Sequence, residues 1–235
     1  MARLGAVAFM RSPPERKETN LAYRRNFPAA TARYAYLIMR RATAPYSSNG
    51  WSNMGAGEGQ VLQLTDGSEV VVRPIGPDDA SLLQAFVRRL SARSRRFRFF
   101  VALAELSAAQ MVRFVNVDPA RGLALVALSR RQEGTAIVAE ARYALAQEDD
   151  NAEFAIAVAD DFQGRGLGRH LVKLLLATAW RRGVRRLFGE IKSDNRAMLA
   201  FATQLGFRLR GSLEDQSVVI ASSVAPSRVD RSPGG

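Results

Sequence analysis

Hydrophobic and polar positions follow a regular pattern only in the middle of the chain, between about residues 60 and 221. Short apolar runs bounded by turn residues predict strands, whereas apolar positions three and four apart predict helices. The expected strands are a hairpin over 61–75 that turns at Asp66 and Gly67, then 122–129, 135–145, 153–158, 184–192, 207–210 and 217–222. The expected helices are 77–90, 107–117, 166–182 and 195–205. This order predicts a mixed α/β sheet.

Local signals support these helix boundaries. Pro77 suits the first position of a helix, and the acidic residues that follow it suit the positive end of the helix dipole. Ser107 and Gln110 have the spacing of a capping box. Gly183 and Gly206 end the two later helices.

The two ends of the chain lack this pattern. Residues 1–58 mix Arg, Pro, Ser, Asn and Gly, and residues 223–235 are similarly linker-like. We expect a disordered basic extension over 1–58, one domain over 59–222 and a disordered tail over 223–235. No apolar run approaches the roughly 20 residues of a membrane span. We therefore expect a soluble, cytoplasmic protein that does not act at a membrane.

The formal net charge is +12, and residues 1–57 carry nine Arg or Lys against Glu15 and Glu18, which gives 9 − 2 = +7. Basic surface of this kind binds phosphate backbones without a specific site. No zinc-finger spacing, aromatic RNA-binding motif or basic heptad region accompanies the charge, so the pattern does not favour nucleic acid as the main partner.

Cysteine is absent and His170 is the only histidine. This excludes disulfides, thiolate metal ligands and a cysteine nucleophile, and it removes most other metal sites and Ser-His-Asp schemes. We therefore expect no metal.

Three glycines follow the strand 153–158 in the sequence QGRGLGR, residues 163–169, and a helix comes next. A strand that runs through glycines into a helix places backbone N–H groups and the positive helix end together, which suits an anion. A P-loop needs Lys-Ser/Thr after its last glycine, and here Arg169 and His170 follow Gly168. A Rossmann motif needs G-x-G-x-x-G, and this loop has G-x-G-x-G.

The loop instead matches Q/R-x-x-G-x-G/A, and on this basis the chain resembles the GNAT acetyltransferases. AVADDFQGRGLG resembles the family's segment from its fourth strand to its third helix, and DNRAMLAFATQLGF resembles the segment from its fifth strand to its fourth helix. DGSEVVVRPIGPDDA and SRRFRFF resemble the acetyltransferase domain of bacterial Pat-type protein lysine acetyltransferases. The resemblance covers about residues 60–221.

The resemblance implies a mostly antiparallel sheet of six to seven strands, flanked by about four helices, with the fourth and fifth strands splayed around acetyl-CoA. It also implies direct attack of a primary amine on the thioester, in a ternary complex. The residues that it assigns to the cofactor are Ala157, Val158, Gln163, Gly164, Arg165, Gly166, Gly168, Arg169 and Asn195.

A primary amine of pKa near 10.4 needs a group that takes its proton at neutral pH. Glu153 is the candidate base, because the family often places a carboxylate at the start of the splayed strand. The alternative interpretation of Glu153 is an ordinary surface carboxylate at the end of a strand, without a catalytic role. Glu190 and Glu140 are the competing candidates for the base.

Many relatives carry a tyrosine acid seven residues after the asparagine, but this chain has Ala202 there. A thiol of pKa around 8.5 leaves as a thiolate with modest help, so transfer does not require that acid. A non-catalytic CoA sensor nevertheless stays open as an alternative.

The acceptor is expected to be a protein lysine, with a small-molecule amine as the alternative, and the protein is expected to be a monomer or a homodimer. Six arginines lie between Arg88 and Arg98. They are interpreted as a solvated helix end with Phe97, Phe99 and Phe100 packing inward, or alternatively as a docking edge for an acidic protein. Tyr143 is expected to flank the acceptor groove together with residues 146–151.

Overall fold

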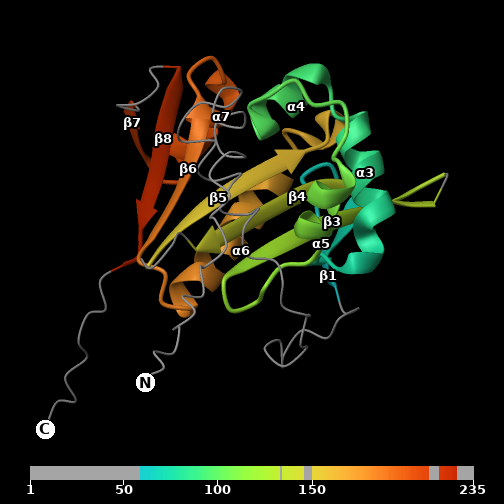
Figure 1. The fold of residues 1–235 in the computed structure, drawn as a ribbon, viewed down its shortest axis with the longest axis horizontal. Helices are drawn as coiled ribbons and strands as arrows, with labels where there is room; N and C mark the ends of the chain where they lie inside the picture. Colours follow the sequence, from blue (N-terminus) through green and yellow to red (C-terminus); the bar gives the residue numbers. More distant parts are fainter. Residues whose placement is uncertain (1–58, 133, 146–149, 212–216, 227–235) are drawn as a thin grey trace, which may run out of the picture.

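The computed structural model describes residues 59–132, 134–145, 150–211 and 217–226, and Figure 1 shows the arrangement of their elements. The strands form one sheet in the order β1-β2-β3-β4-β5-β6-β8-β7. They are β1 (Gln60–Gln63), β2 (Glu69–Pro74), β3 (Gly122–Arg131), β4 (Gly134–Leu145), β5 (Asn151–Val158), β6 (Arg186–Lys192), β7 (Arg208–Gly211) and β8 (Val218–Val224). The helices are α3 (Ala80–Arg89), α4 (Ala92–Phe99), α5 (Ala108–Val115), α6 (Leu167–Arg181) and α7 (Arg196–Gln204), with 3-10 turns η1 (Pro77–Asp79) and η2 (Asp160–Phe162).

The sequence prediction of a mixed, mostly antiparallel sheet is confirmed, but the described part of the chain contributes eight strands to it rather than six or seven. The sheet ends in β1 and β7, two strands of four residues that are mostly exposed. Such short edge strands carry little hydrophobic alternation, and this makes their number hard to predict. The strand pair β5–β6 is parallel, and the other neighbouring pairs are antiparallel.

Helix α4 was expected to be the end of the preceding helix. The chain instead breaks at Leu90, whose ψ of 141° is not helical, and restarts at Ser91. The Ser91 hydroxyl accepts a hydrogen bond from the backbone N–H of Ser94, as an N-cap does. The arginine-rich segment therefore forms a separate helix with its own position over the sheet.

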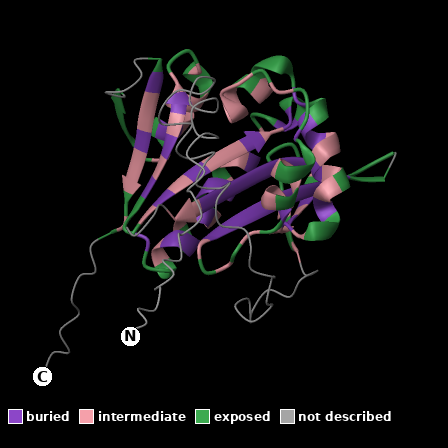
Figure 2. Ribbon diagram, in the orientation of Figure 1, coloured by how far each residue is buried: buried purple, intermediate pink, exposed green. Residues whose placement is uncertain are grey.

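The central strands are buried on both faces, as Figure 2 shows. Side chains of β4 alternate between two layers: Arg142 reaches Phe114 on α5, and the Tyr143 hydroxyl accepts a hydrogen bond from Arg182 at the end of α6. Helices α3 and α6 both pack against β4. Two helical layers thus cover the sheet. None of the described helices combines the length and the hydropathy that a bilayer span requires.

The two ends that were predicted to be disordered are 1–58 and 223–235; all of the first, and residues 227–235 of the second, lie outside the described residues. Strand β8 extends to Val224, two residues beyond the expected end of the domain.

Candidate active site

Strands β5 and β6 pair over three residues and then separate. Asn151, Ala152 and Glu153 are in register with residues 186–188. Beyond this point β5 continues along β4 to Val158, whereas β6 continues along β8 to Lys192. Figure 1 shows the two strands diverging, so the expected splay is confirmed.

Gly189 of β6 lies against Phe154 of β5, directly after the last register pair of the two strands. A Cβ at this position would lie 2.8 Å from Cε1 of Phe154 and 3.0 Å from the Phe154 carbonyl oxygen. The Phe154 ring also contacts Phe207, with the ring centroids 5.0 Å apart. A side chain at position 189 would therefore require a shift of this ring or of one of the two strands.

The glycine loop leads from η2 directly into α6. Gly164 has a φ of 75°, and Gly166, the N-cap residue of α6, has a φ of 84°. Both values lie in the left-handed region that favours glycine. The first N–H groups of a helix have no intrahelical acceptor, and they make its N-terminus suitable for an anion. The loop therefore has the geometry of a phosphate cradle.

The β1–β2 turn contacts this loop through a hydrogen bond and an ion pair. The Thr65 N–H donates to the Arg165 carbonyl at 3.2 Å, and the Arg165 guanidinium forms an ion pair with Asp66 at 2.7 Å. Arg165 also stacks on Phe162, with 4.7 Å from its Cζ to the ring centroid. The charge of Arg165, expected to act on a bound phosphate, is thus paired with a carboxylate here.

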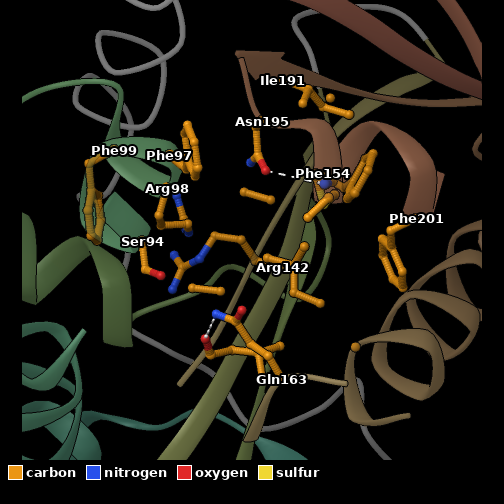
Figure 3. A pocket seen from close by; sticks show the side chains of 18 of the residues that line it. Ser94, Phe97, Arg98, Phe99, Arg142, Phe154, Gln163, Ile191, Asn195 and Phe201 are labelled. Atoms are coloured by element: carbon orange, nitrogen blue, oxygen red, sulfur yellow. Dashed lines mark hydrogen bonds between the residues drawn. The ribbon is translucent and has the colours of Figure 1, made fainter. Parts of the chain in front are cut away.

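A cavity of about 830 Å³ lies between the fork, the glycine loop and helices α4, α5 and α7. It is lined by every residue that the sequence assigned to catalysis or to the cofactor, with the exception of Arg165. Figure 3 shows two of them: the Gln163 amide donates to the Val158 carbonyl at 3.1 Å, and Asn195 caps α7 by accepting from the Met198 N–H. Arg169 donates to the Gln204 side chain at 3.2 Å.

Glu153 lies at the point where the fork opens, and its side chain is partly exposed to the cavity. Burial raises the pKa of Glu153 well above its ordinary value of 4.5, and the nearby Glu190 raises it further, while Arg98 acts in the opposite direction. Glu190 stands two residues beyond Phe188, the register partner of Glu153, and faces the same side of the sheet. A carboxyl with a raised pKa in a cleft is suited to accept a proton near neutral pH.

Glu140, a competing candidate for the base, has the opposite environment. It is 2% exposed and bonded by Arg142 and by Arg98, the latter at 3.1 Å. Burial alone would raise the pKa of Glu140, but the charges of Arg142 and Arg98 outweigh it and hold the pKa below 4.5. This carboxylate is a buried structural ion, and it does not line the cavity.

The cavity wall opposite the fork was not foreseen from the sequence. Helix α4 contributes Phe97, Arg98, Phe99 and Phe100, which are half-buried rather than packed fully inward. Figure 3 shows Arg98 and Arg142 close together in this wall. The signal for the wall was the sequence SRRFRFF, whose three phenylalanines among arginines suggested an amphipathic element without showing what it faces.

Other residues that the sequence singled out lie away from the cavity or outside the described residues. Tyr143 is 2% exposed and faces α6, so the expectation that it flanks the acceptor groove is wrong; its position in β4 sends it to the other layer. Residues 146–149, expected to flank the groove with it, lie outside the described residues. Ala202 is 1% exposed, and its neighbour Phe201 lines the cavity instead. His170 does not line the cavity.

Comparisons with known proteins give one family. A model described as the acetyltransferase (GNAT) family matches residues 87–207. An acetyltransferase of Pseudomonas aeruginosa is 34% identical over 164 residues, which cover 70% of this chain and 88% of the relative. The crystal structure of the GNAT domain of S. lividans PAT superposes with a TM-score of 0.65 at 31% identity, covering 73% of this chain and 99% of that domain.

A third similarity is shorter. The [ribosomal protein bS18]-alanine N-acetyltransferase of Salmonella typhimurium is 44% identical over 59 residues, which cover 25% of this chain and 40% of that protein.

Proposed function

The chain belongs to the GNAT acetyltransferase family, whose members use acetyl-CoA, and we propose that it acetylates the side-chain amine of lysine residues in proteins. The observation that carries this proposal is the position of Glu153. Its carboxyl faces the same cavity as the glycine loop, and its pKa is raised. The candidate base and the loop suited to a phosphate therefore line the same cavity, where β5 and β6 separate.

The donor would be held by residues of the fork and the loop. The backbone N–H groups of Gly164 to Gly168 suit its pyrophosphate, with Arg169 adding charge at the start of α6. The backbone of Ala157 and Val158, in the part of β5 that has left β6, suits its amide-containing arm. Asn195 lines the same cavity at the start of α7.

Glu153 would act on the acceptor. Its carboxylate takes one proton from the acceptor ammonium, and the neutral amine nitrogen then attacks the thioester carbonyl carbon. A C–N bond forms and the C–S bond breaks. The attacking nitrogen passes its second surplus proton either to the leaving sulfur, so that CoA leaves as the thiol, or to water, so that CoA leaves as the thiolate. A thiol with a pKa around 8.5 does not require a tyrosine acid for this departure.

The wall opposite Glu153 favours a lysine as acceptor. Phe97, Phe99 and Phe100 provide apolar surface, on which the four-carbon stem of a lysine can lie while its amine reaches the carboxyl. The resemblance of DGSEVVVRPIGPDDA and SRRFRFF to Pat-type protein lysine acetyltransferases supports the same assignment.

The test is to incubate the full chain with acetyl-CoA and three kinds of acceptor: lysine-containing peptides, peptides with a free α-amine but no lysine, and small free amines. We expect lysine acetylation by mass spectrometry, with stoichiometric CoA release. A preference for small free amines would select the small-molecule alternative. Acetyl-CoA binding with no transfer to any acceptor would select the sensor.

A further inference from the structure

Charged residues of both signs line the cavity, and the two helices of its wall, α4 and α5, contribute only positive ones. The arginines that line it are Arg93, Arg98, Arg113, Arg142 and Arg169, and the carboxylates are Glu153, Asp160 and Glu190. Glu153 and Glu190 lie at the fork, whereas α4 and α5 contribute guanidiniums and no carboxylate. The helical wall is therefore positive where it faces the fork.

Part of this charge is fixed inside the wall. Arg98 and Arg142 share the single carboxylate of Glu140, so one positive charge of the three groups is not compensated among them. Both guanidiniums also stack on Phe114, at 5.6 and 4.0 Å from the ring centroid. These contacts make the wall rigid as well as positive.

The edge of the wall carries two guanidiniums that are more accessible. Arg113 donates from Nε to the Ala109 carbonyl at 2.8 Å, and Arg93 stacks on Phe97 at 5.4 Å. No carboxylate of the described residues forms an ion pair with either of them. The nearby Asp160 is instead bonded by Ser91 and Ser94.

These two arginines come from different helices and line the same cavity. Arg113 shares a face of α5 with Gln110 and Phe114, at the spacing of three and four residues that places side chains together. Arg93 lies one turn before Phe97 on α4. A lysine whose amine reaches Glu153 along the phenylalanines would bring its sequence neighbours next to this edge.

We propose that the acceptor lysine lies in an acidic segment of its protein, whose carboxylates pair with Arg93 and Arg113. This inference rests on the proposed lysine acetylation and adds a sequence preference to it. Partly exposed ion pairs contribute modestly, so we expect roughly a two- to fivefold gain in kcat/KM for each guanidinium engaged.

The experiment compares three peptides of equal length with one central lysine, flanked by glutamates, glutamines or arginines. The wild-type chain is expected to prefer the glutamate peptide over the glutamine peptide, and the arginine peptide is expected to be poorest. The preference should shrink as the salt concentration rises toward about 1 M, where the screening length falls to about 3 Å.

Three variants assign the preference to the two arginines. Arg93→Gln and Arg113→Gln should each reduce the ratio between the glutamate and glutamine peptides, and Arg113→Glu should shift the preference toward the arginine peptide. Arg130→Gln removes the same charge from β3, away from the cavity, and should keep the wild-type ratio. Thermal unfolding of each variant checks that it is folded.

The outcomes separate the two proposals. Equal kcat/KM for the three peptides, or a ratio that Arg93→Gln and Arg113→Gln leave unchanged, overturns the acidic preference while lysine acetylation stands. Absence of transfer to all three peptides overturns lysine acetylation, and with it the preference.

Discussion

Two glutamates on neighbouring strands show how the surroundings of a residue decide its chemistry. Glu140 and Glu153 both lie on the side of the sheet that faces α4 and α5, and Arg98 acts on both. Glu140 is bonded by two guanidiniums, which lower its pKa. Glu153 is half-buried, and this burial, together with the nearby carboxylate of Glu190, raises its pKa. Only the second is suited to exchange protons with an acceptor.

The first prediction concerns the pH dependence of Glu153→Gln. A general base must be deprotonated to act, so wild-type kcat/KM should fall as the pH drops through the raised pKa of Glu153, well above pH 4.5. In the glutamine variant kcat should fall by about 10²–10⁴-fold, and this acid limb should disappear. Steady-state rates across pH, with saturating acetyl-CoA, give the comparison. An unchanged acid limb would remove Glu153 from the reaction.

The second prediction concerns Gly166→Ala. The φ of 84° strains any residue with a Cβ, and that Cβ would also lie 3.3 Å from Cγ2 of Thr65. We expect a stability loss of about 1 kcal/mol and a raised KM for acetyl-CoA, because the loop must shift.

Gly183→Ala is the matched control for this substitution. Gly183 has the same φ of 84°, but it follows α6 and lies far along the chain from the loop. It should lose similar stability and keep the wild-type KM. Equal KM values for the two variants would show that the loop does not hold the donor.

At the scale of elements, the site is made by a fork and by a helix that faces it. The fork was predicted from the resemblance to the GNAT acetyltransferases that the glycine loop carries, because the pattern of apolar positions alone does not show where two strands separate. The sequence did not allow α4 to be predicted as a separate helix, because the break at Leu90 depends on one backbone angle and on the Ser91 cap. It also did not show which layer Tyr143 would face.

The third prediction tests the fork through Gly189→Ala. The added Cβ would lie 2.8 Å from the Phe154 ring, so either the ring or a strand must move. Overpacking of this kind costs about 1–3 kcal/mol, and the distorted fork should bind acetyl-CoA more weakly. Calorimetric titration and thermal unfolding measure the two effects.

Gly211→Ala on the edge strand β7 is the control, since nothing lies within 4 Å of its Cβ position. It should resemble the wild-type chain in both measurements. If Gly189→Ala binds acetyl-CoA as tightly as Gly211→Ala does, the fork does not hold the donor.

At the scale of the whole molecule, the cavity wall is tied to the core by the buried Arg98–Glu140–Arg142 group. Removal of one partner from a buried ion pair costs about 3–5 kcal/mol, because the remaining charges stay buried without compensation. Glu140 therefore connects the shape of the acceptor side to the stability of the domain.

The fourth prediction is that Glu140→Gln lowers the free energy of unfolding at pH 7 by about 3–5 kcal/mol. The folded-state pKa of Glu140 lies below 4.5, so its contribution is present above about pH 4.5 and is lost as the pH falls through the folded value. The difference in the free energy of unfolding between the wild type and the variant should therefore become smaller as the pH falls. Denaturant unfolding at several pH values measures it.

Glu105→Gln removes a carboxylate from the exposed Arg88–Glu105 pair and serves as the control. It should change the stability by at most about 1 kcal/mol. An equally small loss of stability in Glu140→Gln would contradict the structural role of the buried Arg98–Glu140–Arg142 group.

Acetylation of a cell lysate with isotopically labelled acetyl-CoA, by the wild-type chain and by Glu153→Gln, tests directly whether the chain is a lysine acetyltransferase that uses Glu153. We predict labelled ε-amines on defined protein lysines with the wild-type chain and almost none with the variant. Equal labelling by both chains, or labelled small amines without labelled lysines, would contradict a lysine acetyltransferase that uses Glu153 as its base.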